Sequence, residues 1–231
     1  MPQTILAIGA HFDDCVFGIP GILLQALRKH HRVVILSLIG DYSNWGPTRG
    51  REKDFVQATI KISKEYGAEM RYLKYASHRY DVNLDTKRAV AEVVADVRPD
   101  IAFMMWPHDS HHDHEVASVV SKIALRHGDR TLEKPAGFRP PRHIYAYDNG
   151  PRHTVGFEPN TFVDVSQEWA QALEWLGRFM ALTRNQKYDP KAPLDGAQRA
   201  KEALAAYRGQ TCGVRYAEAL WATQAYPQQL F

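Results

Sequence analysis

Short apolar runs alternate with amphipathic segments through the first half of the chain, and this alternation restricts the fold more than any other feature. The apolar runs lie at residues 5–10, 33–39, 70–75 and 101–106, and the third is the weakest. Buried parallel strands have this short apolar character, whereas the segments between them carry apolar residues at helical spacing. A β-α-β order implies parallel strands joined by right-handed crossovers. We therefore expect an α/β fold that is Rossmann-like, with a mostly parallel sheet and helices on both faces.

The other expected elements follow from the same spacing rules. Helices are expected at residues 18–31, 51–66, 85–97 and 115–127. Asp85 is the expected N-cap of the third of these helices. The second half of the chain is less regular, and its expected elements are strands at 143–147 and 162–165 and helices from residue 166 and over 197–207.

We expect a single domain over residues 1–231, because a chain of this length suits one α/β unit. Residues 1–127 would form the core, and residues 128–231 would add a flap or linker and the C-terminal strands and helices. Residues 128–141 are rich in charge, glycine and proline, which is typical of a linker or a moving flap. The aromatic-rich end of the chain is expected to pack onto the domain.

The composition excludes several classes of protein. A net charge of +3 without a block of basic residues argues against a nucleic-acid partner. No apolar stretch approaches the roughly 18 residues of a membrane span, and the N-terminus lacks the pattern of a signal peptide. Two cysteines, Cys15 and Cys212, make no disulfide framework. We expect a globular protein of the cytoplasm. The sequence does not fix its oligomeric state, and a homo-oligomer is compatible with it.

Three side chains that bind metals in other proteins directly follow the first strand. They are His11, Asp13 and Asp14. The carboxyl ends of strands in an open α/β sheet are where ligands bind, and imidazole and carboxylate both suit a divalent metal. A solvated turn in which a carboxylate caps the next helix explains this stretch equally well.

A second polar loop follows the fourth strand. Residues 107–114 hold four histidines and two aspartates among eight residues. A polar loop with capping carboxylates is the alternative interpretation, although a structural loop gains nothing obvious from this density of histidines. Both loops leave buried parallel strands, however, so both lie at one edge of one sheet. Two loops rich in histidine and aspartate that converge at this edge favour a metal site.

The two loops together resemble the signatures of a known family. Residues 11–14, His-Phe-Asp-Asp, resemble the His-Pro-Asp-Asp signature of the LmbE-like, or PIG-L, de-N-acetylases. Residues 111–114, His-His-Asp-His, resemble its second signature, His-Pro-Asp-His, and residues 98–100 and 216–218 agree as well. The resemblance implies a metal-dependent hydrolase that removes an N-acyl group, usually acetyl, from a small amino sugar or a glycoconjugate.

The resemblance also implies the metal ligands and the general base. His11, Asp14 and His114 would hold the metal, with zinc expected and ferrous iron as the alternative in the cell. Asp13 would be the general base that takes the proton of the attacking water. Zinc with three protein ligands keeps a position open and lowers the pKa of its bound water toward about 7.

Two further residues of the second signature would act on the acyl oxygen or on the leaving amine. His111 would stabilise the oxyanion or protonate the leaving amine, and Asp113 would orient it. A histidine held by a carboxylate is expected to stay cationic and to face the developing negative charge.

The loop at residues 40–51 is the expected place for substrate contacts. Arg49 or Arg51 would hold sugar hydroxyls, as the family often does with an arginine, and Trp45 would stack on a sugar ring. Two simpler roles fit the sequence equally well: a solvated first-turn residue for Arg51 and a loop anchor for Trp45. His78, His143 and His153 are expected to be structural or surface residues.

Three positions depart from the family pattern. Phe12 and His112 stand where proline is usual, and Cys15 stands where glutamate is usual. Cys15 is expected to be a buried thiol, with metal binding as the alternative. The departures leave open a degenerate member that binds a ligand without turnover, and an amidase that cleaves a sugar-thiol conjugate is a further alternative. His-Asp dipeptides also occur in HD-domain phosphohydrolases, but that fold is all helical and the alternating strands argue against it.

Overall fold

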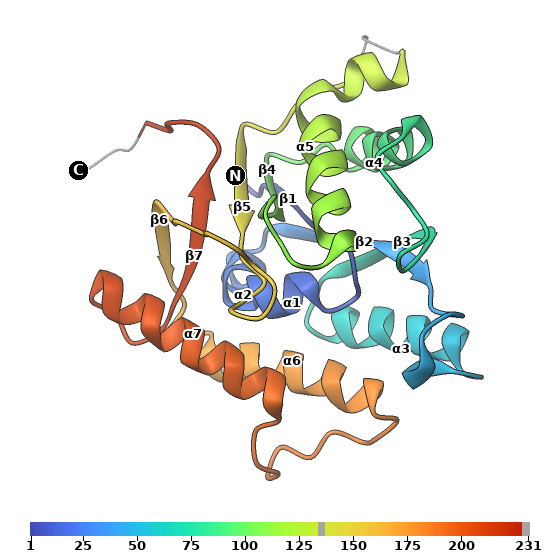
Figure 1. The fold of residues 1–231 in the computed structure, drawn as a ribbon. Helices are drawn as coiled ribbons and strands as arrows, with labels where there is room; N and C mark the ends of the chain where they lie inside the picture. The colour runs from blue at the N-terminus through green and yellow to red at the C-terminus, as the bar shows by residue number, and fades with distance from the viewer. Residues whose placement is uncertain (134–136, 228–231) are drawn as a thin grey trace.

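A seven-stranded sheet forms the centre of the computed structural model, which describes residues 1–133 and 137–227 (Figure 1). Its strand order is β3-β2-β1-β4-β5-β7-β6. The strands are β1 (Thr4–Gly9), β2 (Arg32–Asp41), β3 (Glu69–Ala76), β4 (Ile101–Met105), β5 (His143–Tyr147), β6 (Thr161–Asp164) and β7 (Ala217–Ala222). Strands β1 to β5 are parallel, and β7 pairs antiparallel with both β5 and β6. The expected α/β fold with a mostly parallel sheet is confirmed.

Helices cover both faces of this sheet (Figure 1). They are α1 (Asp14–Gly18), α2 (Pro20–Arg28), α3 (Glu52–Glu65), α4 (Leu84–Val97), α5 (His112–Leu132), α6 (Trp169–Thr183) and α7 (Gly196–Cys212), with a short 3-10 helix η1 at Gly46–Thr48. Helices α4 and α5 pack together on one face, whereas α1, α2, α3 and α6 cover the other and α7 packs against α6 and β7. Among the described residues, no helix combines the length and apolar character needed to cross a membrane.

Two of the expected helices differ from their sequence-based bounds. The first, expected over residues 18–31, is the shorter α2, and α1 precedes it as a separate helix, because Ile19 leaves helical geometry and Pro20 starts a new helix, where its missing N–H costs nothing. Helix α5 runs on to Leu132, with one non-helical residue at His127. Residues 128–132, expected to belong to a linker or flap, are therefore helical. Residues 134–136 of that expected flap lie outside the described residues.

Strand β7 lies in the aromatic-rich end of the chain, where the sequence analysis gave no strand bounds, and a glutamate interrupts its apolar pattern. Glu218 is 2% exposed and lies 2.9 Å from the ammonium of Lys201, which is 3% exposed. The Glu218 carboxylate also accepts hydrogen bonds from the backbone N–H groups of Gly21 and Ile22 (3.0 and 2.8 Å) at the start of α2. Lys201 donates to the carbonyl of Gly18. The buried pair thus joins β7 and α7 to the segment that follows the first polar loop.

Helix α4 begins with a capping box at Asn83, and Asp85 lies one residue inside the helix instead of capping it. The Asn83 side chain accepts from the Thr86 N–H (3.0 Å), and the Thr86 hydroxyl accepts from the Asn83 N–H (3.1 Å). We expect Asn83→Ala to lower the free energy of unfolding by about 1 kcal/mol, since it leaves a helix N–H unpaired. Asn83→Ser is the matched control that keeps a cap. Urea unfolding followed by circular dichroism measures both, and equal stability of the two variants would contradict the prediction.

Candidate functional site

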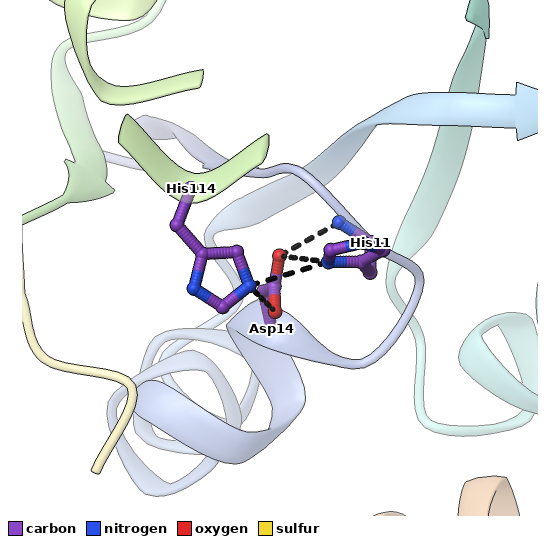
Figure 2. A group of neighbouring side chains, drawn as sticks. All are labelled: His11, Asp14 and His114. Carbon is purple, nitrogen blue, oxygen red and sulfur yellow. Dashed lines mark hydrogen bonds and ion pairs between the residues drawn. The ribbon is translucent and has the colours of Figure 1, made fainter. Parts of the chain in front are cut away.

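The loops after β1 and β4 bring three potential metal ligands together (Figure 2). Strands β1 and β4 are parallel neighbours, so their carboxyl ends lie at the same edge of the sheet. There His11 Nδ1 lies 3.2 Å from His114 Nε2, and His114 Nε2 lies 3.3 Å from Asp14 Oδ1. Asp14 Oδ2 accepts a hydrogen bond from the His11 backbone N–H (2.7 Å). Gly9 permits this fold-back, because a Cβ there would lie 2.7 Å from the Cβ of Asp14.

The donor set of this trio fits a divalent cation such as zinc. Two imidazole nitrogens and a carboxylate oxygen are its usual protein ligands outside cysteine sites. Two nitrogens bonded to one tetrahedral zinc at about 2.0–2.1 Å lie about 3.3 Å apart. The observed separation of 3.2 Å between His11 Nδ1 and His114 Nε2 agrees with that requirement. Three protein ligands leave one position of such an ion for water or substrate.

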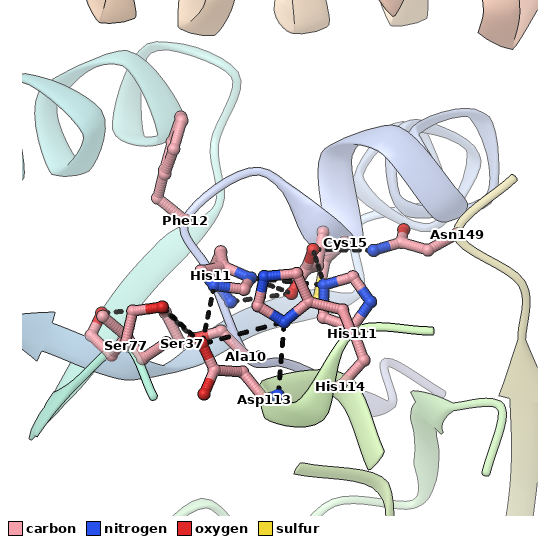
Figure 3. Close-up of polar contacts among 12 residues, drawn as sticks. Ala10, His11, Phe12, Cys15, Ser37, Ser77, His111, Asp113, His114 and Asn149 are labelled. Atoms are coloured by element: carbon pink, nitrogen blue, oxygen red, sulfur yellow. Dashed lines mark hydrogen bonds and ion pairs between the residues drawn. The ribbon is translucent and has the colours of Figure 1, made fainter. Parts of the chain in front are cut away.

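The Asp113 carboxylate orients His11 rather than His111, which corrects the sequence-based expectation. Asp113 Oδ2 lies 3.2 Å from His11 Nε2 and 3.8 Å from His111 Nδ1 (Figure 3). Asp113 is itself held by the Ser77 hydroxyl (2.5 Å) and by the backbone N–H of His78 (2.9 Å). A carboxylate on the far nitrogen of a ligating histidine fixes the ring and its tautomer. Asp113 is therefore placed to support the metal trio.

Two further residues, which the sequence did not single out, form hydrogen bonds or ion pairs with the trio. Asp109 Oδ2 lies 3.1 Å from His114 Nδ1, so it supports this ring as Asp113 supports the other. Asn149 Nδ2 donates to Asp14 Oδ1 (2.6 Å) from the segment that follows β5. Asp109 carried a usable signal, since it lies in the loop rich in histidine and aspartate. Asn149 carried none, because nothing in the sequence pairs it with residue 14.

The two adjacent carboxylates of the first loop differ in their surroundings. Burial and the nearby Asp14 carboxylate raise the pKa of Asp13 to about 6. Burial also acts to raise the pKa of Asp14, but His114 and His11 outweigh it and hold that pKa well below its usual range. The Asp13 side chain lines the cavity and makes no hydrogen bond or ion pair to another side chain within the described part of the chain. Asp14 thus faces the histidines, whereas Asp13 is free to act on a ligand in the cavity.

His111 is neutral in this structure, contrary to the expectation that a carboxylate would keep it cationic. Burial and the positive charges of His11 and His114 lower its pKa to about 4. Its Nδ1 accepts a hydrogen bond from the Asp113 backbone N–H (3.2 Å), so the ring hydrogen is on Nε2. His111 also lines the cavity. It can therefore donate a hydrogen bond there but is a poor source of a proton at neutral pH.

The cavity at this edge has a volume of about 580 Å³ and an aromatic wall on one side. Phe12, one of the departures from the family pattern, packs edge-on against Phe55 and Tyr42. Its backbone N–H donates to the Tyr42 hydroxyl (3.0 Å), a hydrogen bond that proline could not make. Cys15, another departure, is buried 3.4 Å from the Tyr147 hydroxyl. It belongs to none of the metal-binding groups found among the described residues.

The loop at residues 40–51 contributes Trp45 to the cavity wall, but neither of its arginines. The Arg51 guanidinium donates to the carbonyls of Leu182 and Thr183 (2.9 and 2.7 Å) at the C-terminal end of α6. This is a favourable place for a cation, because the last carbonyls of a helix lack partners. Arg49 is exposed and does not line the cavity. The structure therefore places neither Arg49 nor Arg51 at the cavity, where their substrate contacts were expected.

A segment that the sequence did not mark forms another wall of the cavity. Asn149, Pro151, Arg152 and His153 all line it. The His153 ring centre lies 5.3 Å from that of His114, although His153 was expected to be structural or on the surface. The backbone of this segment pairs with the second polar loop through Ser110 N–H to His153 carbonyl (2.8 Å). The first turn of α7 completes the wall with Gly196, Ala197 and Ala200.

Metal uptake at neutral pH is expected to release protons. Burial lowers the pKa values of His11 and His114, but Asp14, Asp113 and Asp109 outweigh it and raise them to about 10 and about 9. A metal needs the deprotonated nitrogen, so its apparent affinity should rise with pH until about pH 9–10. Calorimetric zinc titrations in buffers of different ionisation enthalpy count the protons released. A count of zero at pH 7 would contradict the prediction.

Comparison with known proteins agrees with the fold and the two loops. The family model for PIG-L, described as GlcNAc-PI de-N-acetylase, matches residues 6–125, which is more than half of the chain. The diacetylchitobiose deacetylase of Thermococcus kodakarensis is 23% identical over 94% of this chain and 82% of its own length. The inhibitor-bound N,N'-diacetylchitobiose deacetylase of Pyrococcus horikoshii superposes with a TM-score of 0.75 at 17% identity, covering 96% of this chain and 84% of that one.

The same fold also occurs in an enzyme of another class. The 4-carboxy-2-hydroxymuconate hydratase of Pseudomonas putida superposes with a TM-score of 0.78 at 15% identity, covering 99% of both chains. A structural likeness at this level of identity shows the fold and not the reaction. The family model, in contrast, matches the sequence itself and spans both polar loops. On that match, the chain belongs to the PIG-L family of de-N-acetylases.

Proposed function

We propose that this protein is a metal-dependent hydrolase that removes an N-acyl group, in the first place acetyl, from a small amino sugar or a glycoconjugate. The observation that carries the proposal is the convergence of His11, Asp14 and His114 beside an Asp13 carboxylate that faces the cavity. Family relatives that deacetylate diacetylchitobiose support the substrate class. Because the fold is shared with a hydratase, the proposal rests on the site and on the family match.

His11, Asp14 and His114 would hold the cation, with zinc as the first choice and ferrous iron as the alternative. When bound, the cation lowers the pKa of a water toward about 7 and polarises the acyl carbonyl. A teicoplanin deacetylase with a TM-score of 0.61 has been solved in a zinc-inhibited form. The metal that supports activity is therefore best identified by reconstitution with zinc and with ferrous iron side by side.

Asp13 would take the proton of the attacking water. A pKa near 6 leaves this carboxylate mostly ionised at neutral pH and still basic enough to accept a proton. The protonated Asp13 can then return that proton to the leaving amine. His111 would donate a hydrogen bond from Nε2 to the oxyanion that develops on the acyl oxygen, a role that suits a neutral ring. Asp113 and Asp109 would act by holding the two ligating rings.

Acetate release from N-acetylglucosamine and its derivatives tests the proposal directly. We expect metal-loaded protein to release acetate, chelator to stop it, and added metal to restore it. Cleavage of a sugar-thiol conjugate at another amide would instead identify the amidase alternative. Binding of these compounds without any turnover, in protein that holds stoichiometric metal, would identify a ligand-binding member of the family.

A further inference from the structure

The polar groups of the cavity wall divide into those already paired inside the protein and those left free. The Asn44 amide donates to the Ser77 carbonyl (2.8 Å), and the Ser77 hydroxyl donates to Asp113 (2.5 Å). The Asn149 amide donates to Asp14. These side chains have thus used hydrogen-bond donors within the protein. Among the described residues that line the cavity, Asp13 and Asp14 are the only carboxylates, and both belong to the proposed reaction centre.

Arg152 is an exposed residue of the cavity wall. It is the only arginine or lysine among the described cavity-lining residues. Its guanidinium makes no ion pair and donates no hydrogen bond within the described part of the chain. Arg152 therefore supplies the permanent positive charge among the described residues of this wall. The lining also includes the apolar side chains of Phe17, Pro151 and Ala197.

The backbone at Arg152 is held against the second polar loop, so the position of the residue is defined. The Ser110 N–H donates to the His153 carbonyl (2.8 Å), and the Ser110 hydroxyl donates to the Arg152 carbonyl (3.3 Å). A β-bridge joins Asp109 to Thr154 on the other side. Asp109 also holds the ring of the metal-ligand candidate His114. The Arg152 backbone is therefore tied to the loop that builds the reaction centre.

We propose that the substrate carries an anionic group, a carboxylate or a phosphate, which Arg152 binds in the cavity while the N-acyl group lies at the reaction centre. This inference rests on the proposed function and narrows its substrate class. A guanidinium presents donors only, in a planar fork that matches two oxygens of a carboxylate or phosphate. No carboxylate outside the reaction centre competes for it among the described lining residues.

Three probes that share one ring test the inference: N-acetylglucosamine, N-acetylmuramic acid with a carboxylate, and N-acetylglucosamine 6-phosphate. Calorimetry on metal-loaded protein measures binding, and acetate release is measured on the same preparations. We expect at least one anionic probe to bind about ten- to a hundred-fold more tightly than N-acetylglucosamine, the range for a charged hydrogen-bonded pair. The tighter anionic probe identifies the group as carboxylate or phosphate.

Variants then assign this preference to one side chain. Arg152→Ala should remove the preference, and Arg152→Lys should keep a part of it, because an ammonium has charge but no fork. Arg142→Ala is the matched control: it removes an exposed arginine next to the first residue of β5, at the opposite edge of the sheet, and should leave the preference intact.

Two outcomes overturn the inference. One is that neutral and anionic probes bind with equal affinity, or that none of them binds. The other is that Arg152→Ala keeps the full preference for the anionic probe. Acetate release without any preference would refute the anion site and keep the proposed function. A preference that depends on Arg152 without acetate release would support the anion site and count against deacetylation.

Discussion

Asp13→Asn is expected to lower kcat by about 10²–10⁴-fold, the usual contribution of general-base catalysis, while the protein keeps its metal. The amide has the shape of the carboxylate but cannot accept the proton of the water. Asp13 makes no ion pair with His11 or His114, whereas the Asp14 carboxylate contacts both. Metal content and turnover are measured on the same preparation, and KM should change little.

Asp14→Ala is the matched variant for this experiment, since it removes the neighbouring carboxylate. It should weaken metal binding, and its activity should partly recover in excess metal. His111→Ala should keep its metal, as Asp13→Asn does, and lose turnover through the missing oxyanion hydrogen bond. If Asp13→Asn lost its metal while Asp14→Ala stayed loaded, the two roles would be reversed. Full activity of Asp13→Asn would remove the general base from the mechanism.

His114→Ala is expected to lose most of the bound metal. The ring supplies one of three ligands and is buried, with its Nε2 between His11 and Asp14. Asp109→Asn should have a smaller effect, about ten- to a hundred-fold in metal affinity, which is the usual cost of losing the partner of a ligating histidine. Elemental analysis and zinc titration measure both variants.

His143→Ala is the matched control for the loss of a histidine. It lies at the first residue of β5, at the edge of the sheet away from the site. Its metal content should equal that of the wild type. Stoichiometric metal in His114→Ala would show that this histidine is not a ligand. A graded series, with wild type above Asp109→Asn and Asp109→Asn above His114→Ala, would separate direct ligands from the residues that orient them.

The alternation of apolar runs and helical segments was enough to predict the parallel part of the fold. Burial on both faces of a parallel strand leaves a continuous apolar run, and a parallel neighbour requires a crossover helix. The convergence of the two polar loops followed from the same pattern, because both leave parallel strands at one edge. His11, Asp14 and His114 could therefore be grouped before any coordinates were known.

Tertiary structure alone decided which polar groups became partners. The Arg51 guanidinium donates hydrogen bonds to carbonyls at the end of α6. The Asn149 amide donates to Asp14, which lies 135 residues earlier in the sequence. Glu218 lies in a strand only because Lys201 and the start of α2 compensate its buried charge. Local periodicity indicates which face of an element is buried. It does not indicate which side chain from a distant part of the sequence contacts that face. That choice depends on the three-dimensional packing, and it is what left Arg152 rather than Arg49 or Arg51 facing the cavity.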